Sequence, residues 1–345
     1  MNVAIIGCGL IGTKRARALS TEDHLIVVCD INQERASTLA SEFACESTDN
    51  WQSVVSRNDV DVVINSSINN VLEPITIAAL QAGKHVLCEK PLGRNASESK
   101  RMIEAAHASD RKLKTGFNHR FHPAIWKAKS LLEDGVIGEC LTIRARYGHG
   151  GRPGMENEWR ASKELCGGGE LLDQGVHVID LLRWFGGEIS EAYAKVETKF
   201  WNMEVEDNAF AIMKTRRGVT TSFHVSWTNW KNIFSFEVFG SDGYLAINGL
   251  GGSYGTETLE IGRRKKEGGR PDVEAEEFSA EDRSWNDEWE NFRTAIITDE
   301  EPTGNGVDGH QANRVIEALY RSADMNTTIV LPEELIIQAP SVIHQ

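Results

Sequence analysis

An aspartate and a histidine stand four residues apart in an apolar stretch, GGGELLDQGVHVIDLLRWF, at residues 167–185. Apolar side chains cover most of the helix predicted from Leu171 onward, and Asp173, His177 and Asp180 recur along one stripe of it. This spacing lets the Asp173 carboxylate hold one ring nitrogen of His177 and leaves the other nitrogen free for a proton. The alternative interpretation is a core histidine that is satisfied by its neighbours.

Two other features favour chemistry at this stretch. Three glycines, residues 167–169, directly precede it, and a backbone without side chains allows a bulky ligand to approach. Lys90 follows the buried run HVLC and precedes Pro91, which disfavours helical geometry and keeps Lys90 extended. Lys90 could therefore be a partner for the histidine from another part of the chain, although a structural ion pair explains it equally well.

The stretch GCGLIG near the N-terminus has the pattern G-x-G-x-x-G, and it follows a predicted strand and opens a predicted helix. Glycines in this context allow a tight turn, close approach of the backbone to a pyrophosphate, and close packing of the helix on the strand. The N-terminus of the helix offers N–H groups and a positive dipole end to phosphates. We therefore predict a dinucleotide site that includes Gly7, Gly9, Leu10, Ile11 and Gly12.

Asp30 ends the next predicted strand, 18 residues after Gly12. A carboxylate at this place hydrogen-bonds a ribose 2′-hydroxyl and repels a 2′-phosphate, so we predict NAD in preference to NADP. No metal-ligand spacing is present, and we expect no metal. The six cysteines are scattered without a CxxC pair, which indicates reduced thiols in a cytoplasm.

The N-terminal third alternates Val/Ile-rich strands with amphipathic helices, which predicts a doubly wound α/β domain with a parallel sheet. In such sheets the ligands lie outside the carboxyl ends of the strands. Polar residues gather at the ends of the predicted strands, and they include Asp30, Ser66, Glu89, Lys90 and Asn118. We predict the cofactor at this edge of the sheet.

The remainder of the chain favours antiparallel strands joined by glycine turns such as Arg217-Gly218 and Asp242-Gly243. The sequence predicts two domains, a Rossmann domain over residues 1–121 and an α+β substrate domain over residues 122–345. One face of the second sheet should pack on helices, and the other face should be available for self-association.

Charge and hydropathy exclude some classes of partner. The formal net charge of −14 does not suit nucleic-acid binding, which depends on neutralising phosphates. No apolar run is long enough for a membrane span, and the N-terminus has no feature of a secretion signal. The basic run at residues 262–270 is flanked by glycines and is expected to form a solvated hairpin loop.

Several motifs resemble, in the right order, the glucose–fructose oxidoreductase / inositol dehydrogenase / MocA (Gfo/Idh/MocA) family. The motifs are GCGLIG, Asp30, AGKHVLCEKPL, FNHRFHP, EWR before GGGELLDQGVHVIDLLRWF, and FGSDGYLAING. The resemblance implies a Rossmann domain, an α+β domain with an open sheet, and homodimers or homotetramers. It also implies that Lys90, Asp173 and His177 are catalytic and that Glu89 and Asn118 lie near the nicotinamide.

One stretch departs from the family pattern. Residues 66–74 read SSINNVLEP, whereas family members often carry TPxxxH. The family pattern therefore does not supply the cofactor contacts on this loop, where we predict Ser66.

The resemblance implies hydride transfer between the nicotinamide and a secondary alcohol of a sugar, a cyclitol or a nucleotide-linked sugar. His177 is the expected general base because its unperturbed pKa lies near neutrality. Asp173 would fix its tautomer, and Lys90 would stabilise negative charge on the reacting oxygen. Two alternatives are an NAD-dependent glycoside hydrolase and a non-enzymatic NAD-binding regulator, although retention of the three residues argues against a regulator.

A predicted loop over residues 147–160 and a later aromatic segment carry the candidate substrate contacts. Arg152 and Arg160 could bind an anionic group, but structural ion pairs explain them as well. Trp230 could stack on a sugar ring, and core packing is the alternative. The predicted substrate-binding residues are Arg152, Trp159, Arg160 and Trp230.

Overall fold

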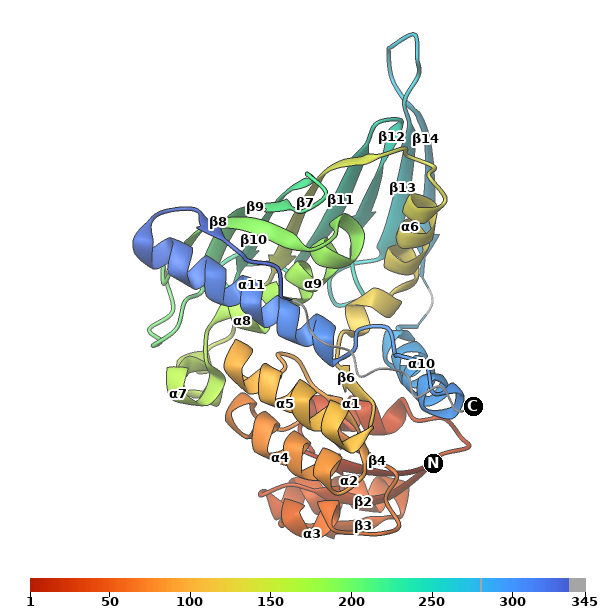
Figure 1. Ribbon diagram of the computed structural model, residues 1–345, viewed down its shortest axis with the longest axis vertical. Helices are drawn as coiled ribbons and strands as arrows, with labels where there is room; N and C mark the ends of the chain where they lie inside the picture. The colour runs from red at the N-terminus through yellow and green to blue at the C-terminus, as the bar shows by residue number, and fades with distance from the viewer. Residues whose placement is uncertain (280, 335–345) are drawn as a thin grey trace. The chain divides into compact units, whose positions relative to one another are not determined.

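The computed structural model describes residues 1–279 and 281–334 (Figure 1). The chain divides into two units. The first unit contains residues 1–116, residues 289–311 and the described residues from Pro332 onward, and the second contains residues 117–288 and 312–331. This division differs from two contiguous segments that meet at residue 121, because residues 289–311 return the chain to the first unit before it re-enters the second unit at residue 312.

The first unit is built on a six-stranded parallel sheet in the order β3-β2-β1-β4-β5-β6. This order reverses at β1 and is the doubly wound arrangement predicted from the sequence. Its strands are β1 (Asn2–Ile6), β2 (His24–Cys29), β3 (Glu46–Thr48), β4 (Val62–Asn65), β5 (His85–Cys88) and β6 (Leu113–Thr115).

Helices connect these strands, and three of the helices have asparagine caps at their N-termini. The side chains of Asn32, Asn50 and Asn95 accept hydrogen bonds from the first turns of α2, α3 and α5. The helices are α1 (Leu10–Arg17), α2 (Gln33–Phe43), α3 (Trp51–Val55), α4 (Asn69–Gln81) and α5 (Ala96–Ser109). Helix α4 begins inside SSINNVLEP, so this stretch is a loop only over residues 66–68.

Helix α10 (Ser284–Thr298) supplies the core of the first unit with residues from late in the sequence. Trp289 and Phe292 are buried in the apolar cluster that contains β1 and β2 residues. The indole N–H of Trp289 donates to Asp23 at 2.9 Å. A buried indole with a partner for its N–H explains why this segment belongs to the first unit.

The second unit contains a nine-stranded sheet in the order β14-β13-β12-β11-β7-β10-β9-β8-β15. Strands β7 and β10 pair in parallel, and the other neighbouring pairs are antiparallel. The strands are β7 (Cys140–Gly148), β8 (Ile189–Glu197), β9 (Asn208–Thr215), β10 (Thr220–Ser226), β11 (Ile233–Gly240), β12 (Gly243–Asn248), β13 (Glu257–Arg263), β14 (Asp272–Phe278) and β15 (Ile329–Val330). The predicted α+β domain with a mainly antiparallel sheet is confirmed.

Helices lie on one face of this sheet (Figure 1). The second unit contains α6 (Pro123–Glu133), α7 (Lys163–Cys166), α8 (Glu170–Asp173), α9 (Gly175–Gly186) and the part of α11 (Gly306–Met325) that follows residue 311, with short 3₁₀ helices at Asn118–Phe121, Met155–Asn157 and Trp159–Ala161. Of these, α6, α8, α9 and α11 contribute apolar residues to the core beneath the sheet. On β9, Ala209, Ala211 and Met213 are buried toward these helices, whereas Phe210 and Ile212 are exposed on the other face.

Two further expectations concern the surface. The basic run 262–270 connects the antiparallel strands β13 and β14, as expected for a hairpin loop. Among the described residues, no helix is long and apolar enough to cross a membrane.

Candidate active site

The glycine motif forms the turn between β1 and α1. Gly7 has a φ of +98°, and a Cβ atom on residue 12 would lie 1.9 Å from the carbonyl oxygen of Gly7. A Cβ atom on Gly9, in contrast, would meet nothing within 4 Å. Gly7 and Gly12 are therefore required by the turn itself, and Gly9 leaves the space outside it open.

This open space has the chemistry of a dinucleotide site. Helix α1 begins at Leu10, and its N-cap residue Gly9 has no side chain to cap the first turn. Asp30 follows β2, and its carboxylate accepts hydrogen bonds from the backbone N–H groups of Cys8 (2.7 Å) and Asn32 (2.8 Å). The loop, the helix terminus and the carboxylate fit a pyrophosphate and an adenosine ribose.

Ser66 and Glu89, two other predicted cofactor residues, support the framework of the first unit. The Ser66 hydroxyl donates to the carbonyl oxygens of Ile6 (3.2 Å) and Gly7 (2.7 Å), and so it braces the glycine turn. Glu89 is buried and forms an ion pair with Arg15 of α1 at 2.6 Å. These interactions give both residues a structural role whatever else they contact.

Lys90 lies in the first unit, two residues after β5, and the peptide bond to Pro91 is cis. Asp173 and His177 lie in the second unit, and so does Asn118, which was predicted to bind the cofactor. The Asn118 amide donates to the hydroxyl of Ser284 at 3.0 Å.

The predicted helix from Leu171 is interrupted. Helix α8 ends at Asp173, helix α9 begins at Gly175, and Gln174 lies between them. The prediction of one continuous helix is therefore wrong, because Asp173 ends α8 and His177 lies in α9. Asp180, the third residue of the predicted stripe, forms a buried ion pair with Arg120 at 2.6 Å and has a structural role.

The three glycines before α8 are explained by packing within the protein. Gly167 has a φ of +88°. A Cβ atom on Gly168 would lie 2.2 Å from the hydroxyl of Tyr320, and one on Gly169 would lie 2.0 Å from the carbonyl oxygen of Glu206. At Gly168 and Gly169 the expectation that a ligand approaches the backbone was therefore wrong, since protein atoms fill that space.

Glu206, which the sequence did not single out, anchors the start of α8. Its carboxylate accepts hydrogen bonds from the N–H groups of Gly169 and Leu171, both at 3.0 Å, and from the hydroxyl of Tyr320 at 2.8 Å. Burial raises the pKa of Glu206, and these hydrogen bonds act in the opposite direction. Glu206 thus holds the segment that leads to Asp173.

His177 is 5% exposed and lies in an aromatic cluster of the second unit. Its ring is stacked on that of His119, with centroids 3.7 Å apart and planes 15° apart. The ring of Phe117 meets it edge-on at 6.1 Å. Packing thus holds the imidazole in one orientation.

Arg160 and His149 lie around Asp173. The guanidinium of Arg160 lies 3.6 Å from the Asp173 carboxylate and 4.4 Å from the ring centroid of Trp159. Burial lowers the pKa of His149, an effect that Asp173 opposes and that Arg152 and Arg160 reinforce. The predicted substrate loop therefore brings Arg160 and Trp159 close to the Asp173 carboxylate.

The other two predicted substrate residues have different surroundings. Arg152 forms an ion pair with Glu158 at 2.6 Å. Trp230 is 62% exposed with a φ of +53°, and its ring meets Phe200 edge-on at 4.8 Å. Core packing does not explain Trp230, whereas it does explain Trp227, which is fully buried.

Comparison with known proteins matches both units. Residues 1–117 match the oxidoreductase family with an NAD-binding Rossmann fold, and residues 125–246 match the GFO/IDH/MocA C-terminal domain. The chain belongs to the Gfo/Idh/MocA family. As a member of that family it is an oxidoreductase, and its cofactor is NAD.

Relatives of this Gfo/Idh/MocA protein include sugar and cyclitol enzymes. It is 29% identical to levoglucosan dehydrogenase of Pseudarthrobacter phenanthrenivorans over 72% of this chain and 73% of that protein. It is 28% identical to myo-inositol 2-dehydrogenase of Thermotoga maritima over 96% and 99% of the two chains. A solved levoglucosan dehydrogenase in complex with NADH and levoglucosan superposes with a TM-score of 0.88 at 25% identity, covering 96% of this chain and 100% of that chain.

Two residues near His177, His119 and Tyr147, were not singled out from the sequence, and only His119 had a signal there. His119 lies inside the quoted motif FNHRFHP, next to Asn118. Tyr147 is the penultimate residue of β7 and is buried, but a single tyrosine near a strand end carries no pattern that separates it from core residues.

Proposed function

We propose that this Gfo/Idh/MocA protein is an NAD-dependent dehydrogenase or reductase that acts on a secondary alcohol of a small polyol ring. One combination of features carries the proposal. The same chain holds an open glycine turn with a carboxylate at Asp30 and a buried, oriented imidazole at His177. A nucleotide site and an acid–base group are the two requirements for such a reaction.

In the proposed reaction each of the three predicted catalytic residues has a separate task. NAD, when bound, accepts or donates the hydride. His177 takes the hydroxyl proton of the alcohol as a general base. Asp173 stabilises the resulting positive charge, and Lys90 donates a hydrogen bond to the reacting oxygen.

The charges around Asp173 favour a neutral substrate. Arg152 is paired with Glu158 and Arg160 lies against Asp173, so a phosphate or carboxylate would have to displace one of these carboxylates. A sugar or cyclitol needs only hydrogen-bond donors and acceptors and an apolar face. The relatives named for levoglucosan and myo-inositol support the same class, whereas neither is named as a hydrolase.

Two tryptophans are proposed to contact the ring of the substrate. Trp159 lies against Arg160, which in turn reaches Asp173. Trp230 borders the same loop, because a Cβ atom on Gly150 would lie 3.1 Å from the Cα atom of Trp230. An exposed indole held beside such a loop can stack on the apolar face of a sugar ring.

The proposal is tested with purified protein, NAD and a panel of inositols, anhydrosugars, aldoses and sugar nucleotides. We expect NADH absorbance to rise with at least one neutral polyol and not with phosphorylated sugars alone. Release of sugar from a glycoside without net formation of NADH would identify a hydrolase instead. Binding of NAD without turnover of any member of the panel would favour the regulator.

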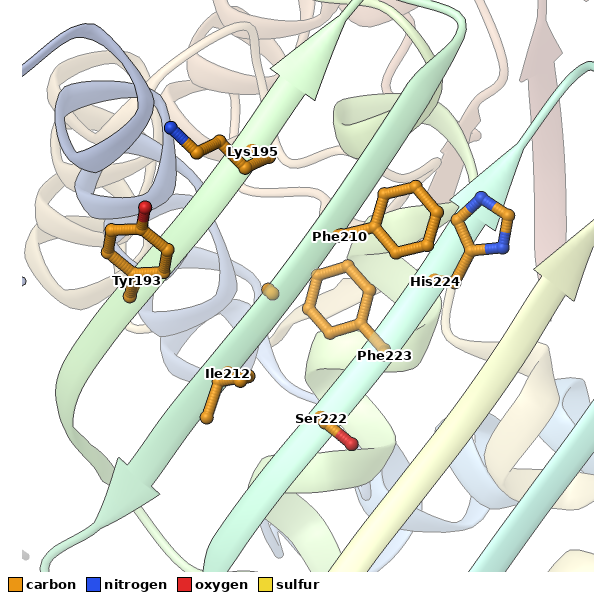
Figure 2. Close-up of a pocket in the computed structure, with 8 residues that line it drawn as sticks. Tyr193, Lys195, Phe210, Ile212, Ser222, Phe223 and His224 are labelled. Atoms are coloured by element: carbon orange, nitrogen blue, oxygen red, sulfur yellow. The ribbon is translucent and has the colours of Figure 1, made fainter. Parts of the chain in front are cut away.

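The outer face of the nine-stranded sheet is proposed to join two copies of this chain, as a homodimer or within a homotetramer. Figure 2 shows the side chains of β8, β9 and β10 that line a depression on this face, among them Phe210, Ile212 and His224. Phe210 and His224 are stacked with centroids 3.9 Å apart, and Phe210 and Ile212 are 50% and 59% exposed. Exposed apolar side chains on an ordered sheet are typical of a self-association surface. We expect Ile212→Lys to lower the mass measured by light scattering, and an unchanged mass would refute the assignment.

We also propose a cytoplasmic location. The structure shows all six cysteines as free thiols. Thiols remain reduced in that compartment.

A further inference from the structure

His119 is held by hydrogen bonds at both of its ring nitrogens. Nδ1 lies 3.2 Å from Oδ1 of Asn118, and Nε2 lies 3.1 Å from the hydroxyl of Tyr147. The Asn118 amide group is oriented by its own hydrogen bond from Nδ2 to the hydroxyl of Ser284. Because a carbonyl oxygen can only accept, Nδ1 of His119 carries a proton.

The second nitrogen of His119 faces a hydroxyl that can donate. Burial raises the pKa of Tyr147 well above its usual range, so this phenol keeps its proton. With Nδ1 protonated and Nε2 accepting from Tyr147, both nitrogens are satisfied while the His119 ring remains neutral. The surroundings therefore select one neutral tautomer.

The neutral ring of His119 lies flat against His177. At a centroid separation of 3.7 Å, two positively charged imidazoles would repel each other strongly. A general base at His177 becomes positively charged when it takes a proton. The stacked neighbour must then stay neutral, and its two hydrogen bonds favour that state.

The same group of polar residues also reaches the junction between the two candidate catalytic helices. The side chain of Gln174 donates to the hydroxyl of Tyr254 at 2.9 Å. The ring of Tyr254 lies 5.1 Å from that of Tyr147, and the two hydroxyls interact. Tyr147 is thus connected to His177 through His119 and to the residue after Asp173 through Tyr254.

We propose that His119 is a positioning residue, a neutral imidazole fixed between Asn118 and Tyr147, which holds the ring of His177 in its reactive orientation. The catalytic role of the His177 ring rests on the proposed function, in which His177 is the base. The tautomer and the stacking of His119 do not depend on that function. Histidine is suited to this place because it combines a flat ring with two hydrogen-bonding edges.

The first test needs no substrate. Long-range ¹H–¹⁵N spectra of the histidine-labelled protein at pH 7 report the protonation of each ring nitrogen, and His119→Phe and His177→Ala assign the two signals. We expect His119 to be neutral with the proton on Nδ1 alone, and Tyr147→Phe to shift the Nε2 resonance, which loses its hydrogen bond, while Nδ1 keeps its proton. A doubly protonated His119, or an unchanged signal in Tyr147→Phe, would overturn the proposal.

The second test separates positioning from simple folding. Loss of one buried hydrogen bond in Tyr147→Phe should lower kcat by roughly 3- to 10-fold, with little change in KM for NAD. His119→Phe, which keeps a flat ring, should retain more activity than His119→Ala. Tyr244→Phe is the matched control, since its hydroxyl contacts Glu260 on the β12–β13 hairpin and its loss should leave kcat unchanged.

The two tests separate failure of this inference from failure of the proposed function. If His177→Ala keeps full turnover while the spectra show the expected tautomer, the base has been misassigned and the positioning of the ring stands. If His177→Ala loses turnover while kcat of Tyr147→Phe and of both His119 variants equals that of the wild type, the positioning role is overturned and the base stands.

Discussion

Gly169 lies against Glu206 so closely that a Cβ atom on residue 169 would be 2.0 Å from the carbonyl oxygen of Glu206. The backbone N–H of Glu170 donates to that same oxygen at 2.9 Å, and the Glu206 side chain accepts from Gly169 and Leu171. The start of α8 is thus bound on consecutive residues by one glutamate. The geometry of Asp173, three residues later, depends on this contact.

Gly169→Ala should therefore destabilise the protein. The added methyl group overlaps backbone that cannot move without breaking these hydrogen bonds, and overpacking of this kind costs at least about 1–3 kcal/mol. Urea unfolding would measure the change. Gly9→Ala is the matched control, because its Cβ would meet nothing within 4 Å, and equal losses of stability in both variants would contradict the packing argument.

Asp30→Ala should weaken NAD binding and narrow the gap between NAD and NADP. The variant loses the carboxylate proposed to bind the ribose hydroxyl, a charged hydrogen bond whose loss lowers affinity by roughly 10-fold or more. Fluorescence titration with both cofactors measures the two dissociation constants. Asp59→Ala, at an exposed carboxylate paired with Arg57, should leave both unchanged. A wild-type protein that binds NADP more tightly would refute the role of Asp30.

Lys90→Ala should preserve the fold and the affinity for NAD but lose most turnover. Removal of one donor to a developing negative charge typically lowers kcat by about 10²- to 10³-fold. Circular dichroism checks the fold, titration checks the affinity for NAD, and steady-state rates measure turnover. Near-normal turnover in a folded Lys90→Ala protein would show that the lysine has only a structural role.

His177→Ala should lower the rate by roughly 10²- to 10⁴-fold, the usual share of general acid–base catalysis. Asp173→Asn should also slow turnover, because an amide stabilises a protonated imidazole less well than a carboxylate does. The rate of alcohol oxidation should rise with pH as one group loses its proton, and this limb should vanish or shift in the His177 variant. An unchanged limb would move the role of base to another residue, with Lys90 the first candidate.

Asp180→Asn is the control for a loss of stability in His177→Ala and Asp173→Asn. Asp180 is buried in its ion pair with Arg120, and breaking such a pair typically costs about 3–5 kcal/mol. Asp173 is partly exposed, so Asp173→Asn should unfold at nearly the wild-type urea concentration. If the His177 and Asp173 variants instead unfold as readily as Asp180→Asn, residues 167–185 are architectural.

The parallel sheet of the first unit could be read from the sequence because each of its signals is local. The Val/Ile-rich strands predicted for the N-terminal third are present as β1, β2, β4 and β5. Strand β3 was missed, because three residues of mixed polarity carry no periodic pattern. The glycine turn was predicted because a φ of +98° at Gly7 requires that residue type.

The candidate site was predicted less completely because it depends on contacts between distant residues. The break at Gln174 has no proline to mark it, and the glycine that follows was read as part of one helix. The three glycines were noticed, but their cause lies in Glu206 and Tyr320, far along the chain. The stacking of His119 on His177 joins residues 58 positions apart and leaves no periodic trace.

The return of residues 289–311 to the first unit limits how the protein can be divided by evolution or by engineering. A fragment that stopped near residue 121 would lack Trp289 and Phe292, and Asp23 would lose the indole that donates to it. Neither unit is therefore formed by one continuous segment of the chain. A chimera that transplants this Rossmann unit onto another substrate domain would need at least two junctions, so that the late helix travels with the early strands.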